Sequence, residues 1–370
     1  MYFLKLKKIL IISSEFPPLP GGIGTHAFHL ASELSKKGYV IQVHTNRRMT
    51  DNEEETTFDR SQFFSVHRTE RKNWGRTYWY RIAAVLHIVK QKQPDIVVAS
   101  GKFSLWMGAL TSLFFKSITS VAIIHGTELK AGGFFSRWFT KMSLKRFEKV
   151  VAVSHFTKNK IAAILPDVCV TVIPNGIVLP DGFFSDVQKE LPVALVTVGN
   201  LTLRKGQHNV INALPELLSW KDTIQYHCVG LPTELEAIKA KINELQLGDS
   251  VIFHGVLTET EKRVRLQKSH VFIMLSEHLA NGDFEGFGIA VLEANALGLP
   301  AIGSVNSGIA DAIQEGYSGK LVDPHDPIAI KAALMEIYGD YETYSNQSKI
   351  WAQQFQWKDI IEKYCTIMEL

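Results

Sequence analysis

The chain has 370 residues, which is too long for one ordinary domain and fits two domains of roughly 150–200 residues each. Hydrophobic residues make up 46% and charged residues 21% of the sequence, a composition that excludes a disordered or fibrous chain. The formal net charge is only +3, from 40 basic and 37 acidic residues, which argues against a dedicated nucleic-acid binder.

Cysteines and apolar runs indicate a cytoplasmic chain that does not cross a membrane. The three cysteines are far apart and form no Cys-x-x-Cys pair, so we expect neither a disulfide scaffold nor a zinc site. Residues 1–20 resemble a signal peptide weakly, but Glu15 and the prolines cut the apolar stretch short, and we interpret it as the first buried strand. The longest other apolar stretch, residues 104–115, is well below the ~20 residues that span a bilayer.

Two segments share one plan of strand, glycine-bearing loop and helix. Because their apolar strands show no alternation, they are expected to be buried on both faces, in parallel sheets covered by helices. A tight glycine turn between strand and helix is also a natural cradle for a phosphate. The first segment has its strand at residues 8–14, its loop at 16–24 and its helix at 25–37, and the second has them at 193–198, 199–206 and 207–218.

Further strands are expected in each half of the chain. They lie at residues 40–44, 95–99, 121–124 and 150–153, and then at 225–229, 251–253 and 271–275. The halves meet near residues 173–176 and the loop to residue 190, whose prolines and glycines predict a hinge. The sequence therefore predicts an α/β protein of two doubly wound domains facing each other across a cleft, where such sheets bind ligands at the carboxyl ends of their strands.

The most informative stretch runs from Glu285 to residue 300. Glu285 lies in a loop after a strand, and the glycines on either side of Phe287, Gly286 and Gly288, let backbone N–H groups approach an anion at the helix start. Glu293 falls about two turns into that helix. Two such carboxylates can accept hydrogen bonds from the sugar and the ribose of one nucleotide sugar. The alternative is that the two glutamates have no ligand and serve only as an N-cap and as part of a solvated helix face.

At this point the sequence resembles the retaining glycosyltransferases of family 4, the group 1 glycosyltransferases with the GT-B fold. Their Glu-x7-Glu pattern matches Glu285 and Glu293, and the resemblance covers nearly the whole chain. Its other motifs lie at residues 21–24, 125–126, 153–154, 174–177, 205–206, 253–255, 298–300 and 319–323. The resemblance implies a Rossmann-like acceptor domain over residues 1–180 and a Rossmann-like nucleotide-sugar domain over 190–345. Residues 346–370 would form a C-terminal helix that returns to the first domain.

The resemblance also implies roles for single residues of the second domain. Glu285 would contact the transferring sugar, and Glu293 the ribose hydroxyls. Lys205, helped by Arg204, would pair with the diphosphate, because a point charge on a flexible stem suits a phosphate leaving group. The alternative for Lys205 is a solvated lysine in a turn.

In the first domain, the resemblance places His125 beside the donor sugar. His125 follows the expected strand at 121–124 and so lies at its carboxyl end; a structural histidine is the alternative. Gly22 and Gly24 would let their loop approach the phosphates or the acceptor, and a simple turn is the alternative. Four other histidines have no such support and are expected at the surface or in the core: His26, His29, His208 and His278.

One departure from the family pattern concerns the phosphate contacts. The family usually has an arginine after the glycine that follows the first strand of the second domain, whereas here Gly199 is followed by Asn200. One phosphate-pairing cation is therefore missing, so that either Arg204 substitutes for it or the donor contact at Asn200 is looser. Ser307, where a glycine is more usual, would add a hydroxyl near the phosphates.

The function implied by the resemblance is transfer of a hexose-type sugar, with retained configuration, from a UDP- or GDP-linked donor to a glycan or lipid-linked acceptor. The nucleotide sugar is a substrate and no cofactor is expected. No Asp-x-Asp ends an apolar strand and the resemblance implies no bound metal, so no metal site is expected. No nucleophile elbow occurs, so a Ser/His/Asp nucleophile is not expected either. The alternatives are a sugar-nucleotide epimerase or phosphorylase of the same fold and a catalytically silent binding subunit. The set Glu285, Glu293, Lys205 and His125 argues against a silent subunit.

A basic and aromatic stretch at residues 134–149 indicates peripheral association with the inner face of a membrane. Arg137, Lys141 and Lys145 recur every four residues, which puts them on one stripe of a helix beside Trp138. Such a stripe suits an anionic bilayer, and the alternative is an amphipathic helix packed on the first domain with its charged side in solvent. Residues 71–81 have a similar composition and would add to a membrane or lipid-acceptor surface, or bind a charged glycan.

Overall fold

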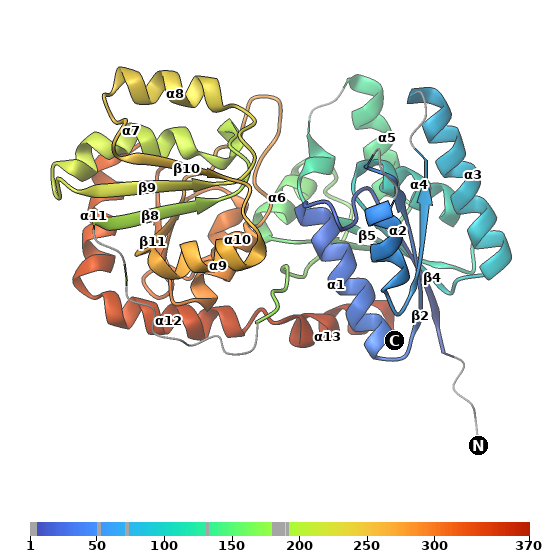
Figure 1. The fold of residues 1–370 in the computed structure, drawn as a ribbon. Helices are drawn as coiled ribbons and strands as arrows, with labels where there is room; N and C mark the ends of the chain where they lie inside the picture. Colours follow the sequence, from blue (N-terminus) through green and yellow to red (C-terminus); the bar gives the residue numbers. More distant parts are fainter. Residues whose placement is uncertain (1–5, 50–52, 71–73, 131–132, 180–188, 190–191) are drawn as a thin grey trace. The chain divides into compact units, whose positions relative to one another are not determined.

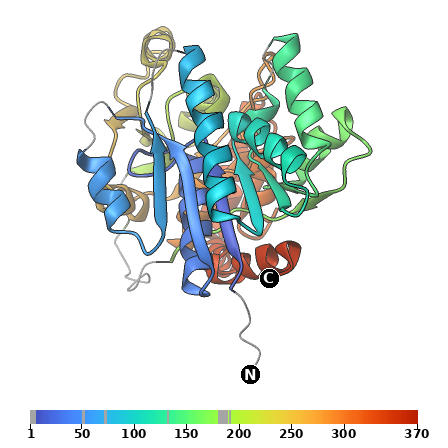
Figure 2. The same ribbon diagram turned by 90° about the vertical axis from the view of Figure 1, so that its right-hand side faces the viewer.

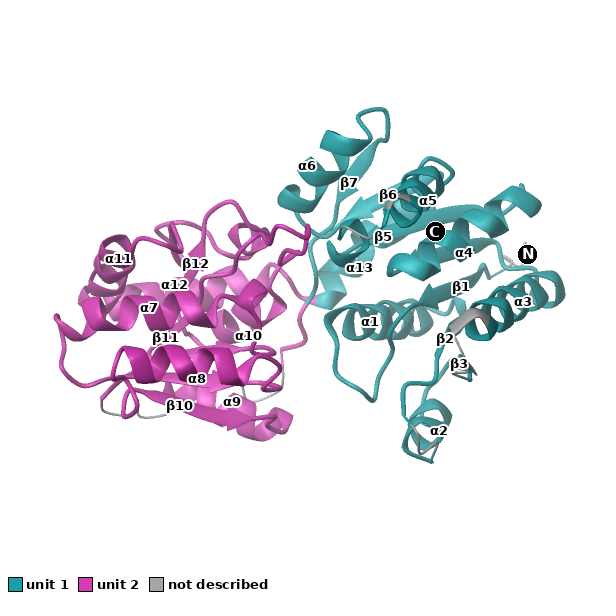
Figure 3. Ribbon diagram, turned by 90° about the horizontal axis from the view of Figure 1, so that it is seen from above, with its two compact units in different colours: residues 1–176, 357–370 teal, residues 177–356 magenta. Residues whose placement is uncertain are grey.

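The computed structural model describes residues 6–49, 53–70, 74–130, 133–179, 189 and 192–370. Most of the expected hinge and residues 71–73 of the second basic stretch lie outside the described residues. The chain divides into two compact units (Figure 3). Unit 1 comprises Met1–Gly176 and Trp357–Leu370, and unit 2 comprises Ile177–Gln356.

Unit 1 is built on a seven-stranded sheet in which every neighbouring pair of strands is parallel (Figure 2). The strands are β1 (Lys8–Ser13), β2 (Val40–Asn46), β3 (Ser65–Thr69), β4 (Ile96–Ser100), β5 (Thr119–Ile124), β6 (Lys149–Ala152) and β7 (Val170–Val172). The helices are α1 (Gly22–Lys36), α2 (Glu53–Arg60), α3 (Trp74–Lys92), α4 (Lys102–Phe114), η1 (Thr127–Leu129), α5 (Phe134–Leu144), α6 (His155–Ile164) and α13 (Trp357–Met368).

Unit 2 repeats the arrangement with six parallel strands (Figure 1). The strands are β8 (Val193–Val198), β9 (Ile224–Val229), β10 (Val251–Gly255), β11 (Val271–Met274), β12 (Ala301–Ser304) and β13 (Gly319–Val322). The helices are η2 (Leu203–Lys205), α7 (Gln207–Leu218), α8 (Leu235–Glu244), α9 (Glu259–Lys268), α10 (Ile289–Ala296), η3 (Gly308–Ala312), α11 (Pro327–Gly339) and α12 (Tyr341–Gln353).

Both sheets are doubly wound, as the sequence predicts. The strand order is β3-β2-β1-β4-β5-β6-β7 in unit 1 and β10-β9-β8-β11-β12-β13 in unit 2. The chain therefore reverses its direction across the sheet between β1 and β4, and again between β8 and β11. At such a point the loops that leave the two strands diverge, which opens a place for a ligand at the carboxyl edge of the sheet.

The C-terminal segment is shared between the units. The break falls between Gln356 and Trp357, so α12 belongs to unit 2 and α13 to unit 1. In unit 1, the Tyr364 hydroxyl lies 2.9 Å from Nε2 of His26, and the Trp357 ring lies 5.1 Å from the His26 ring between centroids. The last helix thus completes the core around α1. No helix among the described residues is long and apolar enough to span a membrane.

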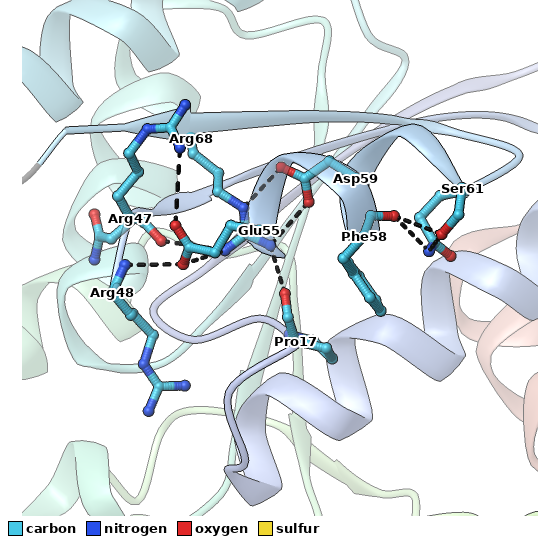
Figure 4. A network of polar contacts seen from close by, with 10 residues as sticks. Pro17, Arg47, Arg48, Glu55, Phe58, Asp59, Ser61 and Arg68 are labelled. Atoms are coloured by element: carbon cyan, nitrogen blue, oxygen red, sulfur yellow. Dashed lines mark hydrogen bonds and ion pairs between the residues drawn. The ribbon is translucent and has the colours of Figure 1, made fainter. Parts of the chain in front are cut away.

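A buried ionic network ties α2 to the loop that follows β1 (Figure 4). Arg68 on β3 binds both oxygens of Asp59 at 2.8 Å through Nε and Nη2, and its Nη1 donates to Oε1 of Glu55 at 3.0 Å. Nη2 also donates to the carbonyl of Pro17. The side chains of Arg68 and Glu55 are only 1% and 0% exposed. Arg68 therefore holds the glycine-bearing loop of residues 16–24 against α2.

Replacing Arg68 by methionine should strongly destabilise unit 1. The substitution leaves the Glu55 carboxylate buried without its main partner, and breaking such a pair from one side costs about 3–5 kcal/mol. Urea unfolding followed by tryptophan fluorescence measures this loss. Arg60, which is exposed on α2, is the matched control, and Arg60→Met should change the free energy of unfolding by less than about 0.5 kcal/mol. Equal stability of the two variants would contradict a structural role for the network.

Candidate functional site

Three of the expected site residues meet at the switch point of unit 2. Lys205 and Arg204 lie on η2, in the loop that leaves β8, and Glu285 lies in the loop that leaves β11. Nζ of Lys205 is 2.8 Å from Oε2 of Glu285, and Nη1 of Arg204 binds the same oxygen. Nε of Arg204 also lies 3.7 Å from Oδ1 of Asp283. The expected diphosphate-binding cations and the expected sugar-binding carboxylate therefore form one cluster.

Glycines let these two loops approach closely. Gly206 ends η2 with a φ of +76°, and a Cβ there would lie 1.8 Å from the carbonyl oxygen of Leu275 at the end of β11. Gly308 donates its N–H to the carbonyl of Glu285 at 3.0 Å, and a Cβ at Gly308 would lie 2.2 Å from the Gly286 backbone. A side chain at Gly206 would push the loops after β8 and β11 apart, and one at Gly308, in the loop after β12, would displace the backbone that carries Glu285.

The charge of Glu285 is set by its two cationic partners. Burial alone would raise the pKa of Glu285, but the nearby charges of Lys205 and Arg204 outweigh it and lower this pKa to about 2. Glu285 is therefore ionised throughout the neutral range. An ionised carboxylate accepts hydrogen bonds only, so it can bind hydroxyl groups of a ligand.

Glu293 lies on α10 and is paired with a residue that the sequence did not single out. Nζ of Lys262, on α9, is 3.2 Å from Oε2 of Glu293. Both side chains line a pocket of about 490 Å³ between α9 and α10, with Ile177 and Val178 at another wall. Lys262 carries no recognisable sequence motif, because its relation to Glu293 depends on how two helices pack.

The remaining candidate residues of unit 2 can contact a ligand mainly through their backbone groups. Gly288 begins α10 in the left-handed region, with a φ of +83°, where a glycine is favoured. The Phe287 side chain is buried and packs 6.1 Å from the Phe355 ring, so any contact of Phe287 with a donor would come from its main chain. Asn200 is exposed after β8, and its carbonyl accepts from Nε2 of Gln207 at 3.2 Å.

His125 lies at the carboxyl end of β5 in unit 1, as predicted. Its Nε2 is 2.9 Å from the Ser100 hydroxyl at the end of β4, and its ring lies 4.9 Å from the His26 ring. Burial lowers the pKa of His125 to about 3. The imidazole is therefore neutral at physiological pH and can donate one hydrogen bond and accept another.

Glu128 supports the turn that carries His125, and the sequence did not reveal it. One of its carboxylate oxygens accepts from the backbone N–H groups of His125 at 3.0 Å and of Gly126 at 2.9 Å. Burial raises the pKa of Glu128 to about 7, although backbone hydrogen bonds oppose this shift. Its place three residues after His125, on η1, was the only available signal.

Gly22 and Gly24 lie in the first turn of α1, in unit 1. Gly21 precedes this helix without any side-chain cap, and the first turn has no acidic residue. Gly24 lies close to the backbone of Phe16, since a Cβ at this position would be 3.1 Å from the Phe16 nitrogen, whereas Gly22 has open space around it. Close packing against Phe16 thus explains the glycine at position 24, whereas Gly22 leaves the start of the helix accessible.

Comparison with known families accounts for both units. The model for Glycosyltransferase Family 4 matches residues 20–179, and the model for Glycosyl transferases group 1 matches residues 183–354. Together they take in most of the chain. The chain belongs to the retaining glycosyltransferases of family 4, the group 1 glycosyltransferases.

Individual relatives are more distant. A protein of Salmonella typhimurium named as the colanic acid biosynthesis glycosyltransferase WcaL is 32% identical over 40% of this chain, and the match spans only 36% of that protein. A GDP-mannose-dependent phosphatidylinositol monomannoside mannosyltransferase of Mycolicibacterium smegmatis is 25% identical over 90% of this chain and 89% of its own length. The structure of Anabaena HepE in complex with UDP and glucose has the same GT-B fold, with a TM-score of 0.76 and 17% identity over 98% of this chain and 99% of that chain.

The ring of His125 should not titrate between about pH 5 and 8, because burial disfavours the imidazolium form. Long-range proton–nitrogen NMR spectra of the histidine rings measure this directly. The signals of His125 are those missing from the His125→Gln variant. A titration midpoint near about 6.5, the value of a solvated histidine, would show that the ring becomes a cation and contradict the neutral form.

Proposed function

We propose that this chain transfers a hexose, with retained configuration, from a UDP- or GDP-linked donor to a glycan or lipid-linked acceptor. The observation that carries the proposal is the cluster of Glu285, Lys205 and Arg204 at the switch point of the parallel sheet in unit 2. Cations beside a carboxylate suit a ligand that has both a diphosphate and a hydroxylated sugar. Family membership supports the same reaction class.

Lys205 is proposed to neutralise the diphosphate as it leaves. Its side chain runs past Gly199, where a Cβ would lie 3.4 Å from the amine nitrogen, so the glycine makes room for the lysine beside Glu285. When the diphosphate takes Lys205 and Arg204 as partners, Glu285 becomes available to the sugar hydroxyls. The departing phosphate then takes the proton of the acceptor hydroxyl, so that no dedicated protein base and no metal ion are needed.

The nucleoside is proposed to lie along α10 beyond Glu285. Glu293 would accept hydrogen bonds from the ribose hydroxyls, and the pocket of about 490 Å³ beside it is within the size range of small-molecule sites. His125 is proposed to act beside the donor sugar as a neutral hydrogen-bonding group rather than as a cation. Asn200, Gly22 and Gly24 are proposed as further donor contacts through amide groups.

The relatives support the donor classes in this proposal. HepE was crystallised with UDP and glucose, and the M. smegmatis mannosyltransferase is described as GDP-mannose-dependent. A lipid-linked or glycan acceptor is proposed because that mannosyltransferase is named for a phosphatidylinositol monomannoside, and a cytoplasmic site of action is proposed from the scattered cysteines. Incubation with UDP-glucose or GDP-mannose should release the nucleoside diphosphate slowly without an acceptor. Phosphate dependence or epimerised donor would favour the phosphorylase or epimerase alternative.

The two glutamates should be separable by binding and rate measurements. Glu293→Gln should weaken both the donor and the free nucleoside diphosphate by roughly 1.5–3 kcal/mol, because the ribose does not change during the reaction. Glu285→Gln should lower turnover by about a hundredfold or more, since the sugar changes charge and geometry in the transition state. Its affinity for the free diphosphate should persist, because Lys205 and Arg204 are then released from a competing carboxylate.

Calorimetric titration of UDP and GDP and steady-state kinetics on both variants check this pair of expectations. Loss of diphosphate binding in Glu285→Gln together with unchanged binding in Glu293→Gln would reverse the two roles. Unchanged binding and rate in both variants would remove the basis of the proposed function.

The surface around α5 is the part of unit 1 proposed to contact an anionic membrane. Phe135, Trp138 and Phe139 are 74%, 49% and 49% exposed, and Arg137 on the helix and Lys145 at its C-cap are exposed as well. On α3, Trp79 is also 74% exposed.

Arg81, which also lies on α3, is only 3% exposed, and its guanidinium lies 4.5 Å from the centroid of the Phe103 ring. Arg81 is therefore part of the interior, and the expectation that it adds to this surface is wrong.

Replacing Arg137, Lys141 and Lys145 together by glutamine should weaken binding to anionic vesicles by about 1 kcal/mol per charge at most. Co-sedimentation with the vesicles measures this binding. The matched control replaces three lysines of other helices, Lys239, Lys241 and Lys358, and should leave vesicle binding unchanged. Identical binding of the two triple variants, or no binding of the parent protein, would favour the alternative of a solvated charged helix.

A further inference from the structure

Lys262 of α9 contacts two carboxylates, one on its own helix and one on α10. Its Nζ lies 3.2 Å from Oε2 of Glu293 and 2.8 Å from Oε2 of Glu259. The Lys262 side chain is only 16% exposed, whereas Glu259 is 87% exposed at the rim. The lysine is thus directed inward along the pocket wall, toward the carboxylate proposed to hold the ribose.

The start of α9 is built to hold Lys262 in this place. Thr258 caps the helix through a reciprocal capping box with Glu261, so that the first turn is fixed by side-chain hydrogen bonds at both ends. Lys262 stands one position after Glu261 and three after Glu259, which puts it within reach of the Glu259 carboxylate on the same helix face. A cation held in this way has little freedom left, and its position relative to α10 is defined.

We propose that Lys262 is a positioning residue for the nucleoside, which fixes one carboxylate oxygen of Glu293 and leaves the other to accept from the ribose hydroxyls. The inference rests on the proposed function and deepens it, because it names the residue that prepares the ribose contact. A carboxylate whose rotamer is already fixed loses less conformational freedom when a ligand binds.

The charges around Glu293 support this role. Burial raises the pKa of Glu293, and the charge of Lys262 opposes this rise. Glu259 raises the same pKa and Lys205 of η2 lowers it, and Arg263 of α9 lines the same pocket. Without Lys262, the carboxyl group would protonate at a higher pH. A protonated carboxyl is a weaker acceptor, so nucleotide affinity should then fall as the pH decreases.

The test titrates UDP and GDP into the full chain by calorimetry between about pH 6 and 8. Lys262→Met should weaken binding of the diphosphate about tenfold, because one charge-assisted hydrogen bond is lost. The ratio of its dissociation constant to that of the parent protein should increase toward low pH. Lys262→Gln should do the same if Lys262→Met fails to fold, and Lys262→Arg should restore most of the affinity. Because the diphosphate itself changes its ionisation over this range, the affinity of each variant is compared with that of the parent protein at the same pH.

Lys320 provides the matched control, since its Nζ also bridges two carboxylates of unit 2, Glu315 at 3.0 Å and Glu336 at 3.1 Å. Lys320→Met should bind the diphosphates like the parent protein. Lys262 variants that bind like the parent, or that lose affinity equally at every pH, would overturn the positioning role while leaving the proposed function intact. If the parent protein binds neither UDP nor GDP, the proposed function itself is wrong.

Discussion

The pairing of one buried carboxylate with two cations organises unit 2. Glu285 comes from the loop after β11, and Arg204 and Lys205 come from the loop after β8, so their attraction joins the two loops that diverge at the switch point. A buried carboxylate without these partners would be strongly destabilising. The same cations suit a diphosphate, so a donor could replace the internal carboxylate with its own negative charge. The free protein thus keeps its cations in place before any substrate arrives.

The two units place different site candidates at the carboxyl edges of their sheets. Unit 2 places a permanently ionised carboxylate, an arginine and a lysine there, which suits charge that moves onto a leaving diphosphate. Unit 1 places His125 there, whose pKa is lowered to about 3, together with the Ser100 hydroxyl. Neutral groups of this kind orient hydroxyls without attracting phosphate.

The absence of the family's usual arginine at Asn200 has a structural counterpart in Arg204. Its guanidinium binds Glu285 and lies 3.7 Å from Asp283, so it is oriented by two carboxylates of the loop after β11. In the free protein Arg204 therefore orients Glu285 together with Lys205, and both cations remain the proposed partners of a diphosphate.

The sequence by itself determined the fold class and the order of the site residues. An unbroken apolar run predicted β8 with the bounds seen in the structure, because strands buried on both faces have a strong pattern. The glycine-bearing turn that follows this run predicted α7, also with the observed bounds. The sequence did not reveal β3, whose residues Ser-Val-His-Arg-Thr are only partly buried at a sheet edge. Nor could it reveal the contacts of Lys262 with Glu293, of Glu128 with the His125 turn, or of Arg81 with Phe103. The periodicity of a sequence shows which face of one helix or strand is turned to the interior. The contact partners of a side chain depend on which elements the crossover connections bring together, and only the tertiary structure decides that.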